Sequence, residues 1–151
     1  FLKLYISVEI IITNDIQYDL KKILHEKYIN ENNKILEKRK QKLEEPCIEI
    51  DYKDIIILWK KLFDANSPFE ILSIFYDINI LISREIYNIT NKKSGADEIL
   101  PALIHSILLT DYKYIYSTHA YFVLTYNESI YNNIFEFLMV KYLTIINYLI
   151  K

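Results

Sequence analysis

The sequence predicts an all-α fold, a layered bundle of about six to eight helices in a single domain covering residues 1–151. The first reason is that the 151 residues include only one glycine. Tight hairpins and phosphate-binding loops need glycine, so nucleotide-binding α/β folds, most β-sandwiches and most β-barrels are disfavoured. The second reason is that apolar residues recur at helical spacing in several segments, and no linker long enough to divide the chain separates them.

A long helix is predicted from Pro68 to about Ile89. Ser67 is suited to cap this helix and Pro68 to occupy its first position. Glu70, three residues after the cap, can return a hydrogen bond to the cap backbone. The apolar positions of the segment follow one another at steps of three or four residues, which places them on one helix face: Ile71, Phe75, Ile78, Ile82 and Ile86.

Helical segments are also predicted before this long helix. One helical segment is Asp15–Ile29, and the highly charged Asn33–Leu43 is either its continuation or a separate helix; Pro46 closes that region. The segment Asp51–Phe63 forms the next helix. Its apolar residues lie nearly all round the helix axis, so it is expected deep in the bundle.

The polar stretch Asn91–Ala96, which contains Gly95, predicts a turn after the long helix. In the helix that follows, Asp97 occupies the position of a cap. Pro101 lies about one turn further on, where its missing N–H is tolerated or produces a slight kink. The apolar positions of this helix are Leu100, Leu103, Ile104, Ile107 and Leu108. Two further helices, Ser117–Tyr126 and Ile134–Ile150, are joined by a polar junction, Asn127–Asn133.

Composition narrows the class of protein. Lys and Arg total 18 and Asp and Glu 20, giving a formal charge of -2 and a pI near 5.9, whereas nucleic-acid binding leaves a basic footprint. The single Cys47 cannot form an internal disulfide, and His25, His105 and His119 do not have the spacing of metal ligands. We therefore expect an intracellular protein with no nucleic-acid partner, no metal and no cofactor. No apolar run approaches the roughly 20 residues of a transmembrane helix.

The N-terminus and one charged segment bear on what lies next to this domain, in the protein and in the cell. The chain begins with Phe1, and its only methionine is Met139, so we expect a domain excised from a longer protein. A charged cluster is expected to form a solvated helix face, with attraction to an anionic membrane surface as the alternative: Glu37, Lys38, Arg39, Lys40 and Lys42.

The run from Gly95 to Ile104, Gly-Ala-Asp-Glu-Ile-Leu-Pro-Ala-Leu-Ile, follows a long helix opened by Ser-Pro. This arrangement resembles the signature of the vacuolar-protein-sorting-nine (Vps-nine) exchange domain. Other elements of the resemblance follow in order: Trp59–Leu62 before the Ser-Pro start, Tyr116–Tyr121 after the signature, and Glu128-x-x-Tyr131 near the C-terminal end. The resemblance covers residues 14–151.

The resemblance implies a guanine-nucleotide exchange factor for small GTPases of the Rab-five group, which act in endosomal trafficking. In that family, the acidic residue matching Asp97 enters the GTPase nucleotide site and pairs with the lysine that holds the phosphates. It thereby disfavours bound magnesium and the β-phosphate, so nucleotide leaves without covalent chemistry. Pro101 would shape the helix start that presents Asp97, and Tyr131 would contact the GTPase switch region. The docking surface would be a groove between the helix near Asp97 and the C-terminal helix.

The sequence departs from the family pattern at two points. The family usually has threonine three residues after the tyrosine, where this chain has Ile134, so one switch contact would differ. The segment between Tyr121 and Glu128 is shorter than usual, which makes Phe135 an alternative to Tyr131.

Other readings of the same residues stay open. Taken alone, Asp97 is a helix cap, Pro101 a tolerated first-turn proline, and Tyr131 one of 14 tyrosines. The alternative to an exchange factor is a non-catalytic helical scaffold that binds a GTPase or another protein. A membrane-surface helical module is a third reading. An exchange factor would work in the cytoplasm at the periphery of endosomal or vesicle membranes, with any peripheral membrane attachment supplied by parts outside this chain.

Overall fold

The computed structural model describes residues 19–126 and 133–151, and every regular element in these ranges is a helix. Residues 19–27 are helical and lead through Tyr28 into α2. The complete helices are α2 (Ile29–Leu43), α3 (Lys53–Phe63), α4 (Pro68–Thr90), α5 (Ala96–Leu109), α6 (Ile115–Thr125) and α7 (Asn133–Ile150). The predicted all-α class is therefore confirmed.

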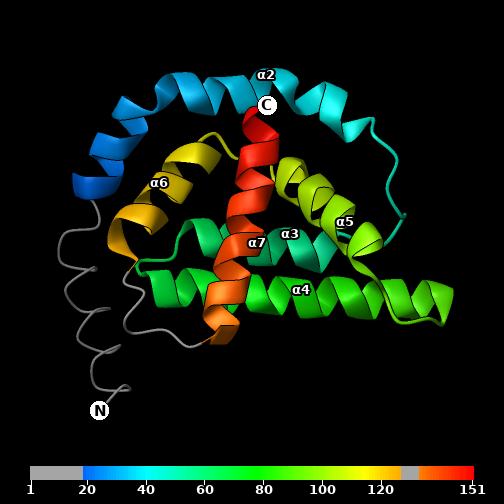
Figure 1. Cartoon of the computed structure of the whole chain (residues 1–151). Coiled ribbons are helices and arrows are strands. Elements are labelled where there is room, and N and C mark those ends of the chain that lie inside the picture. Colours follow the sequence, from blue (N-terminus) through cyan, green and yellow to red (C-terminus); the bar gives the residue numbers. More distant parts are fainter. Residues whose placement is uncertain (1–18, 127–132) are drawn as a thin grey trace, which may run out of the picture.

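The helices form three layers (Figure 1). Helix α2 crosses one side, α5, α6 and α7 fill the middle, and α3 and α4 lie on the opposite side. Helix α4 packs against α3 and all three middle helices, while α2 packs against the same three from above. Both α5 and α7 begin on the α4 side and run towards α2, so their N-terminal ends share one side of the bundle.

Helix α4 forms as the sequence predicts. The Ser67 hydroxyl accepts a hydrogen bond of 3.2 Å from the Glu70 N–H, and Pro68 occupies the first position. The Glu70 carboxylate accepts from the Asn66 N–H at 3.1 Å, one residue before the position expected for a capping box. All five residues of the predicted stripe are completely buried: Ile71, Phe75, Ile78, Ile82 and Ile86.

Helix α3 is amphipathic, so the expectation of deep burial all round was wrong. Ile55, Trp59 and Leu62 are fully buried, but Ile57 on the other face is 47 % exposed. The Trp59 indole donates to the Ser106 hydroxyl at 2.8 Å, and both side chains are buried. This bond fixes the rotation of α5 against α3, because a buried indole N–H needs a partner.

The charged cluster on α2 is only partly a solvated face. Glu37 and Lys40 are exposed, but three basic side chains donate to carbonyls at the C-terminal ends of other helices. Lys42 reaches the Tyr148 carbonyl at 2.6 Å, Lys38 the Ile150 carbonyl at 3.2 Å and Arg39 the Leu108 carbonyl at 2.7 Å. Such carbonyls lack intrahelical donors and carry negative partial charge, so cations stabilise them.

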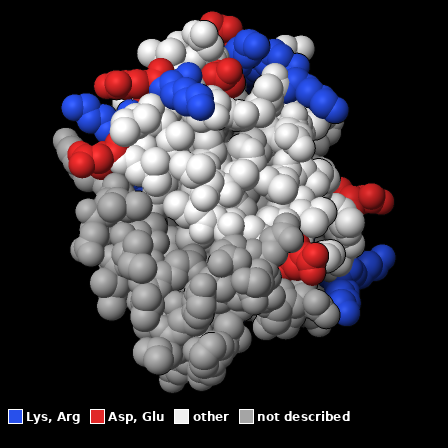
Figure 2. Space-filling model, turned by 60° about the vertical axis from the view of Figure 1, so that its left-hand side comes forward, with Lys and Arg blue, Asp and Glu red and all other residues white. Residues whose placement is uncertain are grey.

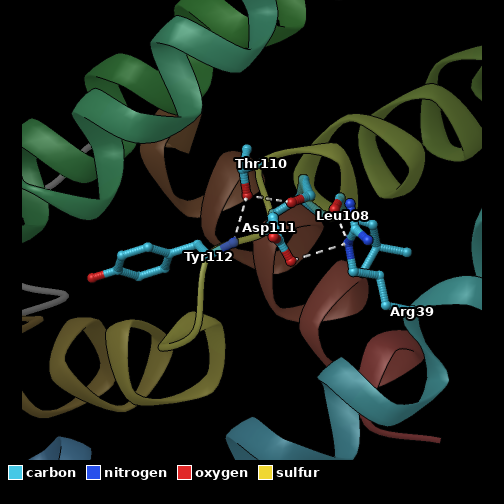
Figure 3. Close-up of polar contacts among 6 residues, drawn as sticks. Arg39, Leu108, Thr110, Asp111 and Tyr112 are labelled. Atoms are coloured by element: carbon cyan, nitrogen blue, oxygen red, sulfur yellow. Dashed lines mark hydrogen bonds and ion pairs between the residues drawn. The ribbon is translucent and has the colours of Figure 1, made fainter.

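Arg39 holds the connection between α5 and α6 (Figure 3). Its Nε lies 3.7 Å from the Asp111 carboxylate in addition to donating to the Leu108 carbonyl. Asp111 adopts a left-handed conformation with φ 55°, which aspartate tolerates better than most residues. The Thr110 hydroxyl donates to the Ile107 carbonyl at 2.6 Å and completes the turn.

Helix α6 receives its N-terminal cap from another helix. The Asn32 side-chain carbonyl on α2 accepts from the backbone N–H groups of Tyr116 and Ser117, at 3.0 and 3.1 Å. The Asn32 amide donates to the Ser117 hydroxyl at 3.1 Å, which lies 2.7 Å from His25 Nδ1. Because Asn32 is buried, its side chain cannot bond to water, and these hydrogen bonds satisfy its polar atoms instead.

Asn32→Ala is expected to lower the free energy of unfolding by about 2 kcal/mol, since two backbone donors at the start of α6 lose their acceptor. Asn33→Ala is the matched control, because Asn33 is an exposed neighbour on the same helix. It should change stability by less than about 0.5 kcal/mol. Urea denaturation of both variants measures the difference, and equal effects would contradict the capping role of Asn32.

Candidate functional site

The predicted site begins at the start of α5. Gly95 is the N-cap and Asp97 the second helical residue, so the expectation that Asp97 occupies the cap position is wrong. No side chain caps this helix end. The carboxylates of Asp97 and Glu98 lie in the first turn, where the helix dipole favours negative charge without a capping bond.

The turn before α5 does not depend on its glycine. Gly95 has φ -100° and ψ 174°, an extended conformation open to any residue, and an added Cβ would meet no atom within 4 Å. The left-handed position is Asn91, the C-cap of α4, with φ 56°. Its N–H donates to the Tyr87 carbonyl at 2.8 Å. The predicted turn is confirmed, but asparagine supplies its unusual backbone angle.

The Asp97 side chain is exposed, and none of residues 19–126 and 133–151 forms a hydrogen bond or ion pair with its carboxylate. Pro101 follows at i+4, Ile104 at i+7 and His105 at i+8, so helical geometry places these three on the same face of α5 as Asp97. Asp97 thus stands at one end of a largely apolar stripe.

Pro101 is the sixth residue of α5, beyond the first turn whose N–H groups have no intrahelical acceptor. Its ring therefore removes the hydrogen bond that the Asp97 carbonyl would otherwise accept. Its half-buried side chain faces a cavity, so the proline forms part of the adjoining surface.

A groove of about 450 Å³ lies along this face of α5. Helix α5 contributes Leu100, Pro101, Ile104 and His105 to its wall. Of the five apolar positions predicted on this helix, Leu100 and Ile104 are half-buried, whereas Leu103, Ile107 and Leu108 are buried. The apolar stripe of α5 is thus divided between the core and this groove.

The opposite wall comes from distant parts of the sequence. The segment after α2 supplies Pro46 and Cys47, and α7 supplies Tyr148 near its C-terminal end. This groove thus lies between α5, the C-terminal end of α7 and the connection from α2 to α3. That it is the predicted docking surface stays a prediction. No local pattern in the sequence links Pro46 and Cys47 to Tyr148, because these positions are about 100 residues apart in the chain.

Polar contacts hold this far wall in place. The Lys42 ammonium lies 3.9 Å from the Tyr148 ring centroid and donates to the carbonyl of the same residue. The Tyr148 hydroxyl donates to the Glu45 carboxylate. That hydrogen bond raises the pKa of Tyr148, while burial lowers the pKa of Lys42. Across the groove, the His105 ring packs against the Tyr52 ring with centroids 5.1 Å apart. Burial lowers the pKa of His105.

The other predicted site residues are Tyr131, Ile134 and the alternative Phe135. Tyr131 falls outside the described residues. Ile134 is the second residue of α7, and only its backbone is described. The ring of Phe135, the alternative to Tyr131, packs against Phe69 of α4 with centroids 5.7 Å apart, which gives it a packing role. Helix α7, like α5, begins on the α4 side of the bundle (Figure 1).

Each histidine packs against a different tyrosine. His25 stacks on Tyr114 with centroids 4.0 Å apart. Burial lowers the pKa of His119 to about 4, so its imidazole is neutral at pH 7. Within residues 19–126 and 133–151, no group of three or more His, Cys, Asp or Glu could hold a metal ion.

No protein-family model matches the chain, and neither the curated proteins nor the solved structures include a significant match. Among the described helices, none is long and apolar enough to cross a bilayer.

Gly95→Ser is expected to stabilise the domain by about 0.5 kcal/mol, because a serine at the N-cap supplies the missing side-chain acceptor. Gly95→Ala should cost a similar amount, about 0.5 kcal/mol, since alanine is a poor N-cap. Thermal and urea unfolding measure both changes. A large loss of stability in the serine variant would show that this position needs glycine.

Proposed function

We propose that this chain is a guanine-nucleotide exchange factor for a small GTPase of the Rab-five group. The observation that supports it best is the exposed Asp97 carboxylate, which has no partner among the described residues and shares a helix face with an apolar groove. The Ala-Asp-Glu-Ile-Leu-Pro sequence around it resembles the Vps-nine signature. The proposed site of action is the cytoplasmic periphery of endosomal or vesicle membranes.

The chemistry follows from charge competition. In a GTPase, the P-loop lysine holds the phosphates of the nucleotide. A carboxylate inserted beside that lysine replaces part of the phosphate charge and repels the phosphate itself. Asp97 would therefore stabilise the nucleotide-free GTPase, and exchange would accelerate through preferential binding of that state. No bond of the protein is made or broken, so the chain acts without covalent chemistry.

The geometry near Asp97 suits this role in two respects. No described partner must be released before the carboxylate enters another protein, so its insertion breaks no bond seen here. The neighbouring groove, about 450 Å³ in volume, has apolar walls at Leu100, Pro101 and Ile104 that can receive apolar side chains of a GTPase switch region.

Asp97→Ala is expected to slow exchange by about 10- to 100-fold, the effect of losing one charge-assisted contact in the nucleotide-free complex. The matched control is Glu98→Ala, because Glu98 is the adjacent exposed carboxylate in the same helical turn. Its effect should stay within about twofold, since it alters only the helix dipole interaction. Release of a fluorescent guanine nucleotide from a panel of Rab-five-type GTPases measures both rates.

Two results would contradict this proposal at different levels. If the unaltered chain accelerates release from no GTPase of the panel, the exchange function is wrong. If Asp97→Ala and Glu98→Ala slow release equally, exchange stands but the specific role of Asp97 does not. Circular dichroism of both variants excludes loss of the fold as the cause.

Ile134 favours a second candidate, a non-catalytic scaffold that binds a GTPase without releasing its nucleotide. It stands where the resembling family usually has threonine, so a hydroxyl contact with the GTPase would be absent. A scaffold would bind the nucleotide-free and the GDP-bound GTPase with similar affinity, whereas an exchange factor prefers the former.

Ile134→Thr is expected to raise the exchange rate by about 3- to 10-fold, the value of one additional hydrogen bond in the complex. The conservative control is Ile134→Val, which keeps the β-branched shape without the hydroxyl and should leave the rate unchanged. Stopped-flow nucleotide release measures the series. Equal rates for both variants would show that this position makes no hydroxyl contact with the GTPase.

The structure gives less support to a membrane-surface module. Lys38, Arg39 and Lys42 donate to helix carbonyls, so much of their charge is already engaged. On the face shown in Figure 2, basic and acidic side chains alternate along the upper edge, where α2 runs, above an uncharged centre. Alternating charge of this kind attracts an anionic surface weakly.

A further inference from the structure

Helix α4 carries a second apolar stripe on the side opposite its buried one. Tyr76 is 46 % exposed, Ile80 43 % and Tyr87 55 %. At 100° per residue these three positions fall within an arc of about 40°, and Asp77 and Arg84 extend the arc to about 100°. We call these five residues the α4 outer face. In Figure 1, α4 forms one side of the bundle, and its C-terminal end extends beyond α5.

The two charges on this face have no partners among the described residues. Neither Asp77 nor Arg84 forms an ion pair or hydrogen bond within residues 19–126 and 133–151. They are seven residues apart, about 10.5 Å along the helix. Within one chain they therefore lie on the same edge of the face but too far apart to form an ion pair with each other.

We propose that the α4 outer face binds a second copy of this chain through antiparallel pairing of the two α4 helices. A twofold axis between positions 80 and 81 places each Arg84 opposite Asp77 of the other copy. Two ion pairs then form on the same edge of the contact. The two Ile80 side chains meet near the axis, and Tyr76 and Tyr87 cover the ends. The face is thus self-complementary in charge, which an isologous dimer requires.

The pairing does not depend on the proposed exchange function. It uses the surface of α4 that points away from the core, whereas Asp97 and the groove belong to α5. A single pair of helix faces buries less than the roughly 1,200 Å² of stable complexes, so we expect a reversible equilibrium between one and two chains. The exposed ion pairs make it weaker at high salt.

Sedimentation equilibrium from about 1 to about 300 μM tests the proposal, and the mass should rise from one chain to two. Ile80→Glu should weaken association at least about tenfold, because it places two carboxylates at the axis. Val140→Glu is the matched control, since Val140 is 55 % exposed on α7. It should leave association unchanged. Circular dichroism verifies that both variants fold.

A charge exchange provides the decisive measurement. D77R and R84E alone each place four like charges along the contact and should weaken self-association at least about tenfold. Mixing the two variants, or combining both substitutions in one chain, restores opposite charges and should restore association. A chain that stays monomeric at the highest concentration overturns the proposal. So does a dimer that Ile80→Glu does not affect, or a pair of charge variants that fails to recover on mixing.

Discussion

Helix ends leave backbone groups without partners, and in this bundle residues 19–43 supply partners for four of the other helices. Lys21 donates to the Ala65 carbonyl just after α3, at 2.8 Å, and Arg39 to a carbonyl in the last turn of α5. Lys42 does the same for α7, while Asn32 caps the start of α6. Helix α2 therefore holds the start of α6 and the C-terminal ends of α5 and α7 through hydrogen bonds as well as apolar packing.

The candidate site depends on these contacts. The groove beside α5 has one wall on that helix and another formed by the end of α2 and by Tyr148, which Lys42 holds from two directions. The bond between Trp59 and Ser106 fixes the rotation of α5, and so decides that the stripe from Asp97 to Ile104 faces outwards. The candidate site is thus positioned by helix capping and one buried side-chain bond.

These dependencies explain what the sequence could predict. The start of α4 was predictable because Ser67, Pro68 and Glu70 act within one turn, and the stripe behind them repeats locally. The role of Arg39 was not, because its acceptor lies 69 residues away and a basic residue on a helix normally faces water. For the same reason, no pattern in the sequence indicates that Tyr148 forms a wall of the groove. The apolar composition of α3 led to the wrong expectation, because composition does not show which apolar residues are buried and which, like Ile57, are exposed.

Helix α4 carries the proposed pairing face and leads into α5, which carries Asp97, but neither proposal requires the other. Its inner stripe contributes completely buried residues to the core, so the helix stays rigid whatever binds to its outer face. Antiparallel pairing about positions 80 and 81 would place the C-terminal ends of the two α4 helices, and the α5 helices that follow them, at opposite ends of the contact. Each Asp97 would then remain accessible to its own GTPase. Pairing would raise the number of sites per particle without changing either one, so its benefit would be avidity on a surface that carries many GTPases.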